Sequence, residues 1–289
     1  TITGQGAIQA NGATNQSSYR TGGSGGRIAL LNYSLLTGRF DSSQLSEQTY
    51  AVTAFGGKGH SNRHGAAGTV FLKGATDSWG TLVVDNGESA TADYISTLLP
   101  SVAEGTITGI SADSITMAGA GWTEDLYPGY LLNPSRAQGA ATLADDIVFE
   151  IKSNTDDTLV LNSTEVDTVG FVGATFGAYF VFGDLHVKGK ARLLTPGDLL
   201  IKGTGSEVNV KGNSHLSARI LELAQGSNHL YAKDSHLDLI EGGLWLEGDL
   251  NLEGASSLTV GPDGLSVSGD SKWAGTTSVS QGNGDFILN

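Results

Sequence analysis

The sequence lacks cysteine and contains one methionine and only five prolines among its 289 residues. Neither a disulfide framework nor thiolate chemistry is therefore available to the chain. It shows no signal-peptide pattern and no apolar run near the ~18 residues that a membrane-spanning helix needs. The chain opens at Thr1 rather than at methionine, so we expect it to be a fragment of a longer protein.

Basic residues are also scarce: 16 Lys and Arg stand against 30 Asp and Glu, for a formal net charge of −14. Such a chain has no basic surface for phosphate backbones, which argues against nucleic acid as a partner. It is equally unsuited to an anionic membrane surface. We expect the excess of acid to keep the protein soluble and to make its copies repel one another.

Glycine is abundant, with 42 residues, far above the usual ~7%. It follows no three-residue period, which excludes collagen. Frequent Val, Leu and Ile with little proline argue against disorder. The composition therefore predicts a folded, turn-rich β protein.

A repeat of about 21 residues runs from about Val181 to the end of the chain. Ser-His-Leu at 214–216 recurs at 235–237, and Ser-Ser-Leu follows at 256–258. A second apolar column contains Leu223, Leu244, Leu265 and Phe286. Short alternating runs separated by glycine-rich turns indicate three strands per repeat with one face buried. The pattern predicts a parallel β-helix, in which only the stack of coils buries the apolar faces.

The N-terminal part repeats more loosely. The segment 23–30 matches 65–72, and the segment 7–12 resembles 51–56, at spacings close to two C-terminal repeats. Between the N-terminal part and the regular repeats, from about Gly87 to Phe182, the alternation about every seven residues stops. Alternating runs with a polar turn at 153–157 predict a small antiparallel β-barrel or sandwich there. We therefore expect three parts: glycine-rich β-helix coils at 1–87, an inserted β module at 88–182 and regular rungs at 183–289.

The insert gathers aromatic residues, and two interpretations stay open for them. They fill its small core, or some form an exposed platform for sugar rings. Trp122, Tyr127 and Tyr130 are the best candidates for such a platform, because Pro-Gly at 128–129 marks a surface turn beside them.

Candidates for catalysis and metal binding are sparse. Asp156 and Asp157 are weak calcium candidates, without the spacing of a known calcium loop. His215 and His236 flank inward leucines one rung apart, so we expect them in an outer ladder. Polysaccharide lyases and hydrolases on β-helices need clustered acids on one outward face. The C-terminal rungs offer only scattered acids: Asp184, Asp198, Glu207, Glu222, Asp238, Glu247 and Asp249.

The glycine-rich signatures at 22–28 and 65–70 resemble modules of very large bacterial cell-surface proteins, and the later rungs resemble the β-helical stalks of secreted adhesins. The resemblance implies an extracellular or cell-surface, non-catalytic structural or adhesive role, with glycans or another surface protein as partner. It assigns no catalytic residue and no cofactor. Two alternatives remain: a carbohydrate-active enzyme on a β-helix, and a segment of a phage or secretion-related fibre or shell.

Overall fold

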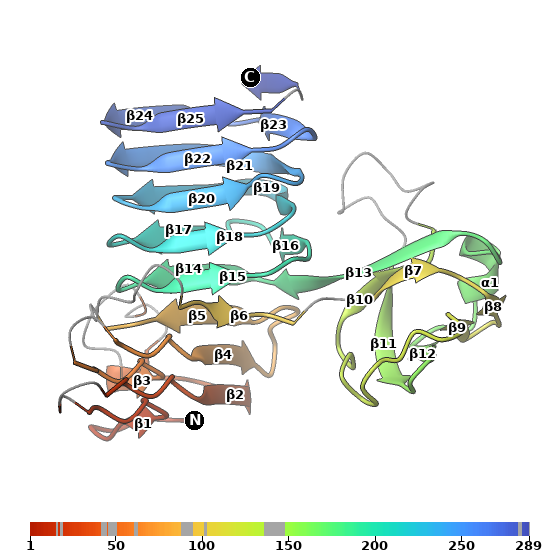
Figure 1. Ribbon diagram of the computed structural model, residues 1–289, viewed down its shortest axis with the longest axis horizontal. Helices are drawn as coiled ribbons and strands as arrows, with labels where there is room; N and C mark the ends of the chain where they lie inside the picture. The colour runs from red at the N-terminus through yellow and green to blue at the C-terminus, as the bar shows by residue number, and fades with distance from the viewer. Residues whose placement is uncertain are drawn as a thin grey trace. The chain divides into compact units, whose positions relative to one another are not determined.

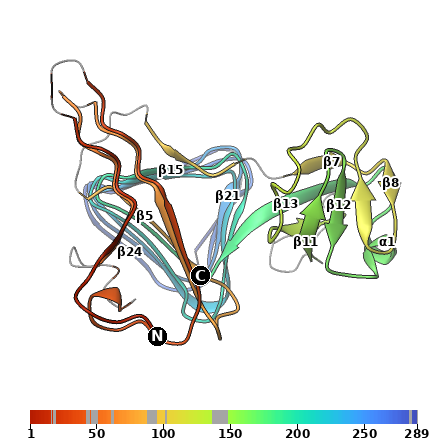
Figure 2. The same cartoon turned by 90° about the horizontal axis from the view of Figure 1, so that it is seen from below.

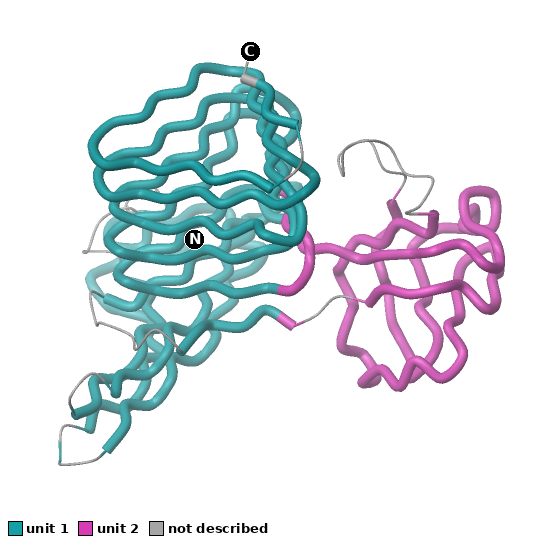
Figure 3. Tube along the Cα trace, turned by 45° about the horizontal axis from the view of Figure 1, so that its top comes forward, with its two compact units in different colours: residues 1–99, 182–195, 201–289 teal, residues 100–181, 196–200 magenta. Residues whose placement is uncertain are grey.

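The computed structural model describes residues 1–15, 17, 20–41, 45, 51–60, 63–87, 95–100, 103–135, 148–282 and 285–288. The protein is nearly all β and forms two compact units (Figure 3). The first unit contains residues 1–99, 182–195 and 201–289, and the second contains residues 100–181 and 196–200. In the described part of the chain, no helix has both the length and the apolar character needed to cross a membrane.

The predicted solenoid is confirmed: about five turns of about 22 residues cover positions 180–287. Each turn of the solenoid, which we call a rung, has three strands, and the rungs trace a triangle when viewed along the stack in Figure 2. Along the chain the strands are β14 (Asp184–Lys188), β15 (Arg192–Leu194), β16 (Leu199–Lys202), β17 (Glu207–Lys211), β18 (His215–Ser217), β19 (Leu221–Lys233), β20 (His236–Leu239), β21 (Gly243–Gly254), β22 (Ser257–Val260), β23 (Gly264–Val267), β24 (Ser271–Gly275), β25 (Ser278–Gln281) and β26 (Phe286–Leu288), and the rungs that they form stack on one another in Figure 1.

Parallel pairing between rungs places like side chains on top of one another. One inward column consists of Leu193, Leu216, Leu237 and Leu258, all of them buried. A second face repeats the arrangement with Leu185, Val208, Leu230 and Leu250. The residues between them alternate outward, so each strand buries one face. The continuous apolar columns form the core that no single rung could provide.

A strict 21-residue register is wrong at one column. Leu244 pairs with Leu221, whereas Leu223 pairs with Leu246. The register of β19 and β21 shifts after Leu223, at a turn where Gln225 and Ser227 adopt positive φ values of 80° and 55°. The first regular rung is longer: Leu185 pairs with Val208 and Leu193 with Leu216, an offset of 23 positions in both cases, so the mean repeat exceeds the 21 residues inferred from the sequence.

The two N-terminal echoes are confirmed as parallel strand pairs. β1 (Ile8–Gln9) pairs with β3 (Val52–Thr53), and β2 (Arg27–Tyr33) pairs with β4 (Thr69–Gly74). However, β5 (Thr81–Asp85) is antiparallel to β4 and parallel to β14. These coils therefore meet the regular rungs through a reversal of chain direction. β6 (Thr97–Leu98) then pairs with β15.

Four glycine-rich segments, at 7–15, 20–26, 51–60 and 63–69, lie against one another through backbone hydrogen bonds. The Gly23 amide donates to the Ala13 oxygen at 2.9 Å, the Gly57 amide to the Gly23 oxygen at 2.8 Å and the Gly65 amide to the Gly57 oxygen at 2.9 Å. We call these four segments the glycine bundle. A Cβ atom would collide with neighbouring backbone at Gly12, Gly22, Gly25, Gly56, Gly57, Gly65 and Gly68. The glycine excess therefore serves close backbone packing as well as turning.

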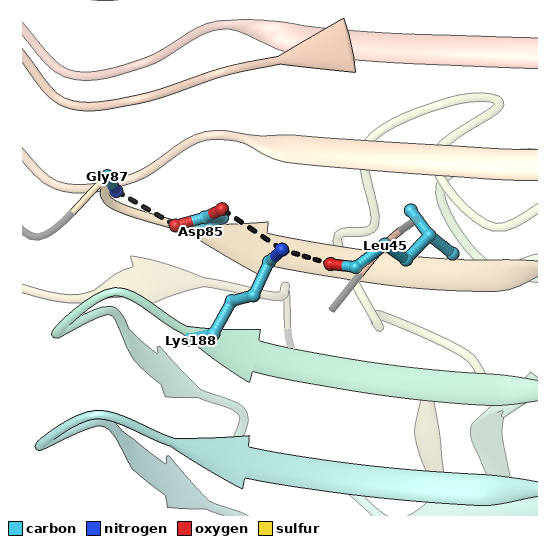
Figure 4. A network of polar contacts seen from close by, with 4 residues as sticks. All are labelled: Leu45, Asp85, Gly87 and Lys188. Carbon is cyan, nitrogen blue, oxygen red and sulfur yellow. Dashed lines mark hydrogen bonds and ion pairs between the residues drawn. The ribbon is translucent and has the colours of Figure 1, made fainter. Parts of the chain in front are cut away.

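A polar network ties the N-terminal part to the first regular rung (Figure 4). The ammonium of Lys188 donates to the carbonyl oxygen of Leu45 and lies 3.4 Å from an Asp85 carboxylate oxygen. The other oxygen of Asp85 accepts from the Gly87 amide at 2.8 Å. The ion pair is largely shielded, since the two side chains are 14% and 22% exposed.

The second unit is an antiparallel sheet in the order β7-β13-β10-β11-β12-β9-β8. Its strands are β7 (Glu104–Thr106), β8 (Gly109–Ile110), β9 (Ser114–Thr116), β10 (Leu131–Asn133), β11 (Phe149–Asn154), β12 (Thr158–Leu161) and β13 (Thr175–Phe182). The two edge strands, β7 and β8, are joined through Ile107 and Thr108, whose amides donate to Ala174 and Thr116 oxygens at 2.9 and 2.8 Å. The sheet thus closes on itself as a small barrel, one of the two forms that the sequence left open, with the β11–β12 hairpin in place.

Candidate functional site

The predicted aromatic residues lie in one loop of the barrel, between β9 and β10. Trp122 and Tyr130 are half-buried against the core, and Tyr127 is buried at 5% exposure. The Tyr127 ring lies edge-on to both neighbours, with centroids 6.1 Å from Trp122 and 5.7 Å from Tyr130. Tyr127 therefore belongs to the core, and burial raises the pKa of its phenol. A platform for a ligand would depend on Trp122 and Tyr130.

Asn154 at the end of β11 fixes this loop. Its side-chain oxygen accepts from the Tyr127 amide at 2.9 Å, and its amide nitrogen donates to the Thr123 and Thr155 oxygens at 2.8 Å. Asn154 is only 2% exposed, so the three bonds are shielded from water. The loop is consequently preorganised rather than free to fold around a ligand.

The weak calcium candidates stand in the turn between β11 and β12. Asp157 accepts from the Thr158 hydroxyl at 2.8 Å and from the Thr155 hydroxyl at 3.3 Å, an arrangement typical of a polar turn. The backbone oxygen of Asp156 accepts from the Trp122 amide at 2.8 Å. Within the described ranges, no three His, Asp or Glu side chains come together in a group that could hold a metal.

The histidine ladder is present on the outer face of the β15–β18–β20–β22 sheet. His215 and His236 are paired partners with ring centroids 6.1 Å apart. The Nε2 atom of His215 lies 2.7 Å from an Asp238 oxygen, and Nδ1 of His236 lies 2.7 Å from the Ser257 hydroxyl. Burial lowers the pKa of His215, against the opposing pull of Asp238. The contacts link successive rungs.

Three of the scattered acids line up on one outward face. The Glu207 amide donates to Asp184 one rung away, Glu207 pairs with His229, and His229 pairs with Asp249. We call this set the acid column. Asp184 accepts from the Thr81 hydroxyl at 3.1 Å and from the Glu207 amide at 2.9 Å.

The remaining contacts of the acids also bridge rungs. Asp249 accepts from the Asp270 amide at 3.0 Å, and Glu247 accepts from the Gln225 and Gly226 amides at 2.9 Å. Beside the acid column, Asn209 lies 3.3 Å from Nδ1 of His186, and burial is the largest cause of the lowered pKa of that imidazole. Asp184, Asp249 and Glu247 thus link neighbouring rungs, whereas Asp198 and Glu222 are buried, at 0% and 2% exposure, and do not belong to an outward face.

The first unit also contains a cleft that the sequence did not predict. It has a volume of about 660 Å³, and its lining includes two aromatic residues, two carboxylates and one ammonium: Tyr33, Trp79, Asp77, Asp184 and Lys202. We call it the rung cleft. These residues come from β2, the turn between β4 and β5, β14 and β16. They are up to 169 positions apart in sequence, so only the stacking of coils brings them together.

Comparison with protein-family models, curated proteins and solved structures found no match to this chain.

Proposed function

We propose that this chain is a non-catalytic structural and adhesive segment of a large bacterial cell-surface or secreted protein, and that it contacts glycans. The observation that supports the structural role is the use of outward acids as links between rungs. Asp184, Glu247 and Asp249 each accept hydrogen bonds from the backbone of a neighbouring coil. A carboxylate that accepts such bonds is held in place.

A continuous solenoid suits a stalk. Its inward columns run without interruption through the regular rungs, and each rung is bonded to the next along its whole length. Stability in such a stack is shared between neighbouring rungs, which suits an extended spacer. The preorganised loop around Trp122 provides one surface that a glycan could contact.

A carbohydrate-active enzyme is the second candidate, and the acid column favours it. Asp184, Glu207 and Asp249 share one outward face with His229. Glycoside cleavage needs an acid and a base on either side of the bond, and a lyase needs a base beside an activated proton. The backbone bonds of Asp184 and Asp249 make the structural use of these acids the better supported interpretation.

A glycan-array screen combined with an assay for polysaccharide cleavage tests the proposal. Binding without cleavage is the expected result, and cleavage that disappears in Glu207→Gln would overturn the non-catalytic role. Trp122→Ala tests the loop of the barrel, with Trp273→Ala as the control, because Trp273 lies on β24 of the last rung and is 43% exposed. A near-ultraviolet circular dichroism spectrum checks that the barrel stays folded.

A further inference from the structure

The rung cleft has the size and the mixture of groups of a site for a small polar ligand. Its volume of about 660 Å³ falls within the range of roughly 300–1,000 Å³ that ligand pockets occupy. All of its lining residues belong to the first unit, so the cleft is complete within the solenoid. The lining comes from separate coils, which means that the cleft exists only in the stacked fold.

Two aromatic residues give the cleft surfaces on which a sugar can stack. Tyr33 and Trp79 both line it and both are half-buried. The face of an aromatic ring carries negative charge density, which attracts the slightly positive C–H groups of a pyranose. Burial and the neighbouring Asp77 carboxylate raise the pKa of Tyr33, so its hydroxyl stays protonated and can donate as well as accept.

Two carboxylates supply acceptors for sugar hydroxyls, and both are held in place. Asp77 accepts from the Gly74 amide at 2.8 Å. Asp184 is fixed by the Thr81 hydroxyl and the Glu207 amide. Each carboxylate has about four lone-pair positions, so acceptor capacity remains for a ligand. Since these side chains are already ordered, binding costs little further conformational entropy.

The charge of the cleft selects among saccharides. The ionisable side chains of the lining are the carboxylates of Asp77 and Asp184 and the ammonium of Lys202, which together carry a net negative charge. A uronate or sulfated sugar would meet like charge, whereas a neutral sugar offers hydroxyls to both carboxylates and to the ammonium.

From the lining and its charge, we propose that the rung cleft binds a neutral saccharide, with Trp79 as stacking surface and Asp77 and Asp184 as hydroxyl acceptors. The proposal rests on the adhesive function and names its ligand class. It places a saccharide site on the solenoid, separate from the aromatic loop of the barrel.

The test uses the whole chain on an array of neutral gluco-, galacto- and manno-oligosaccharides, with uronate-containing oligosaccharides as the anionic arm. A neutral oligosaccharide that binds is then titrated by calorimetry. We expect Trp79→Ala to weaken binding about tenfold, as the removal of an aromatic anchor does. Asp77→Asn keeps the acceptor for the Gly74 amide but loses its charge, and we expect about fivefold weaker binding.

The controls separate this proposal from the adhesive function. Trp273→Ala, on β24 of the last rung, is expected to leave the affinity for the neutral oligosaccharide unchanged. Unchanged affinity in both Trp79→Ala and Asp77→Asn would overturn the saccharide site in the cleft, and a loss confined to Trp122→Ala would move the adhesive function to the barrel. Failure of all neutral oligosaccharides to bind, or preference for uronates, would also overturn the proposal. Cleavage of any glycan would instead refute the non-catalytic function.

Discussion

Replacing Gly57 by alanine tests whether the glycine bundle depends on direct backbone contact. Gly57 is buried, its amide donates to the Gly23 oxygen, and its own oxygen accepts from the Gly65 amide. A Cβ at this position would overlap the Ala13 oxygen and lie 2.5 Å from the Ala13 carbonyl carbon and 2.7 Å from the Gly12 oxygen. The atoms it meets are all backbone, so no side chain can move aside.

The cost follows from the displacement that the methyl group forces. Overpacking a tight interior costs about 1–3 kcal/mol. Moving the segment also weakens the two hydrogen bonds of Gly57, each with a net worth of about 0.5–1.5 kcal/mol. We therefore expect Gly57→Ala to lower the free energy of unfolding of this part of the chain by about 2–5 kcal/mol.

Gly6→Ala is the matched control, because a Cβ on Gly6 meets nothing within 4 Å and its φ is not positive. There the methyl group should be neutral or stabilise by up to about 1 kcal/mol, by restricting the unfolded chain. Hydrogen exchange at the amides of Gly23, Gly57 and Gly65 reports on the bundle directly. Equal protection in the two variants would refute the close-contact argument.

Three further predictions concern the first unit. Leu237→Ala should lower the free energy of unfolding, measured in urea, by about 2–5 kcal/mol, because Leu237 is fully buried. Ile240→Ala, three residues later at a 63% exposed position, should lower it far less. Similar losses of stability in the two variants would argue against the inward column. Lys188→Met should lower the free energy of unfolding by about 1–3 kcal/mol, because it leaves the carboxylate of Asp85 without its cation. It also removes the bond to the Leu45 oxygen, so proteolysis near Leu45 should increase. Unchanged cleavage would show that this bond does not hold Leu45. Burial lowers the pKa of His186 below its ordinary value of 6.5, so the unfolded chain takes up a proton more readily and stability should fall as the pH drops from 7 through the histidine range; His186→Gln should flatten this dependence, and an identical pH profile in the variant would contradict it.

The solenoid could be predicted because its signal is repeated. Leu216, Leu237 and Leu258 recur at a constant spacing, and alternation fixes which neighbours face outward. The register of Leu223 could not be predicted, because the chain takes five residues from Leu216 to Leu221 but seven from Leu237 to Leu244. A change in the length of a corner alters the register without altering the alternation on either side. The sequence match between Leu223 and Leu244 was therefore in the wrong column by one inward position.

Two features could not be predicted from the sequence for the same reason: the reversal between β4 and β5, and the rung cleft. Both depend on which coil stacks on which, and that is set by contacts between distant segments. Trp79 is isolated in the sequence and carries no signal until Tyr33, Asp184 and Lys202 come beside it. By contrast, the loop from Trp122 to Tyr130 was recognisable from its aromatic residues, while its fixation by Asn154 needed the structure.

The passage from β5 to β14 has a consequence for the evolution of such chains. The two strands pair residue for residue from Thr81 with Asp184 to Asp85 with Lys188, although the whole barrel lies between them in sequence. The solenoid therefore tolerates a domain-sized insertion at a corner without loss of register, since the entropy of closing a loop grows only slowly with its length. Such a corner is a natural grafting point, where one module could replace another during recombination while the scaffold stays intact.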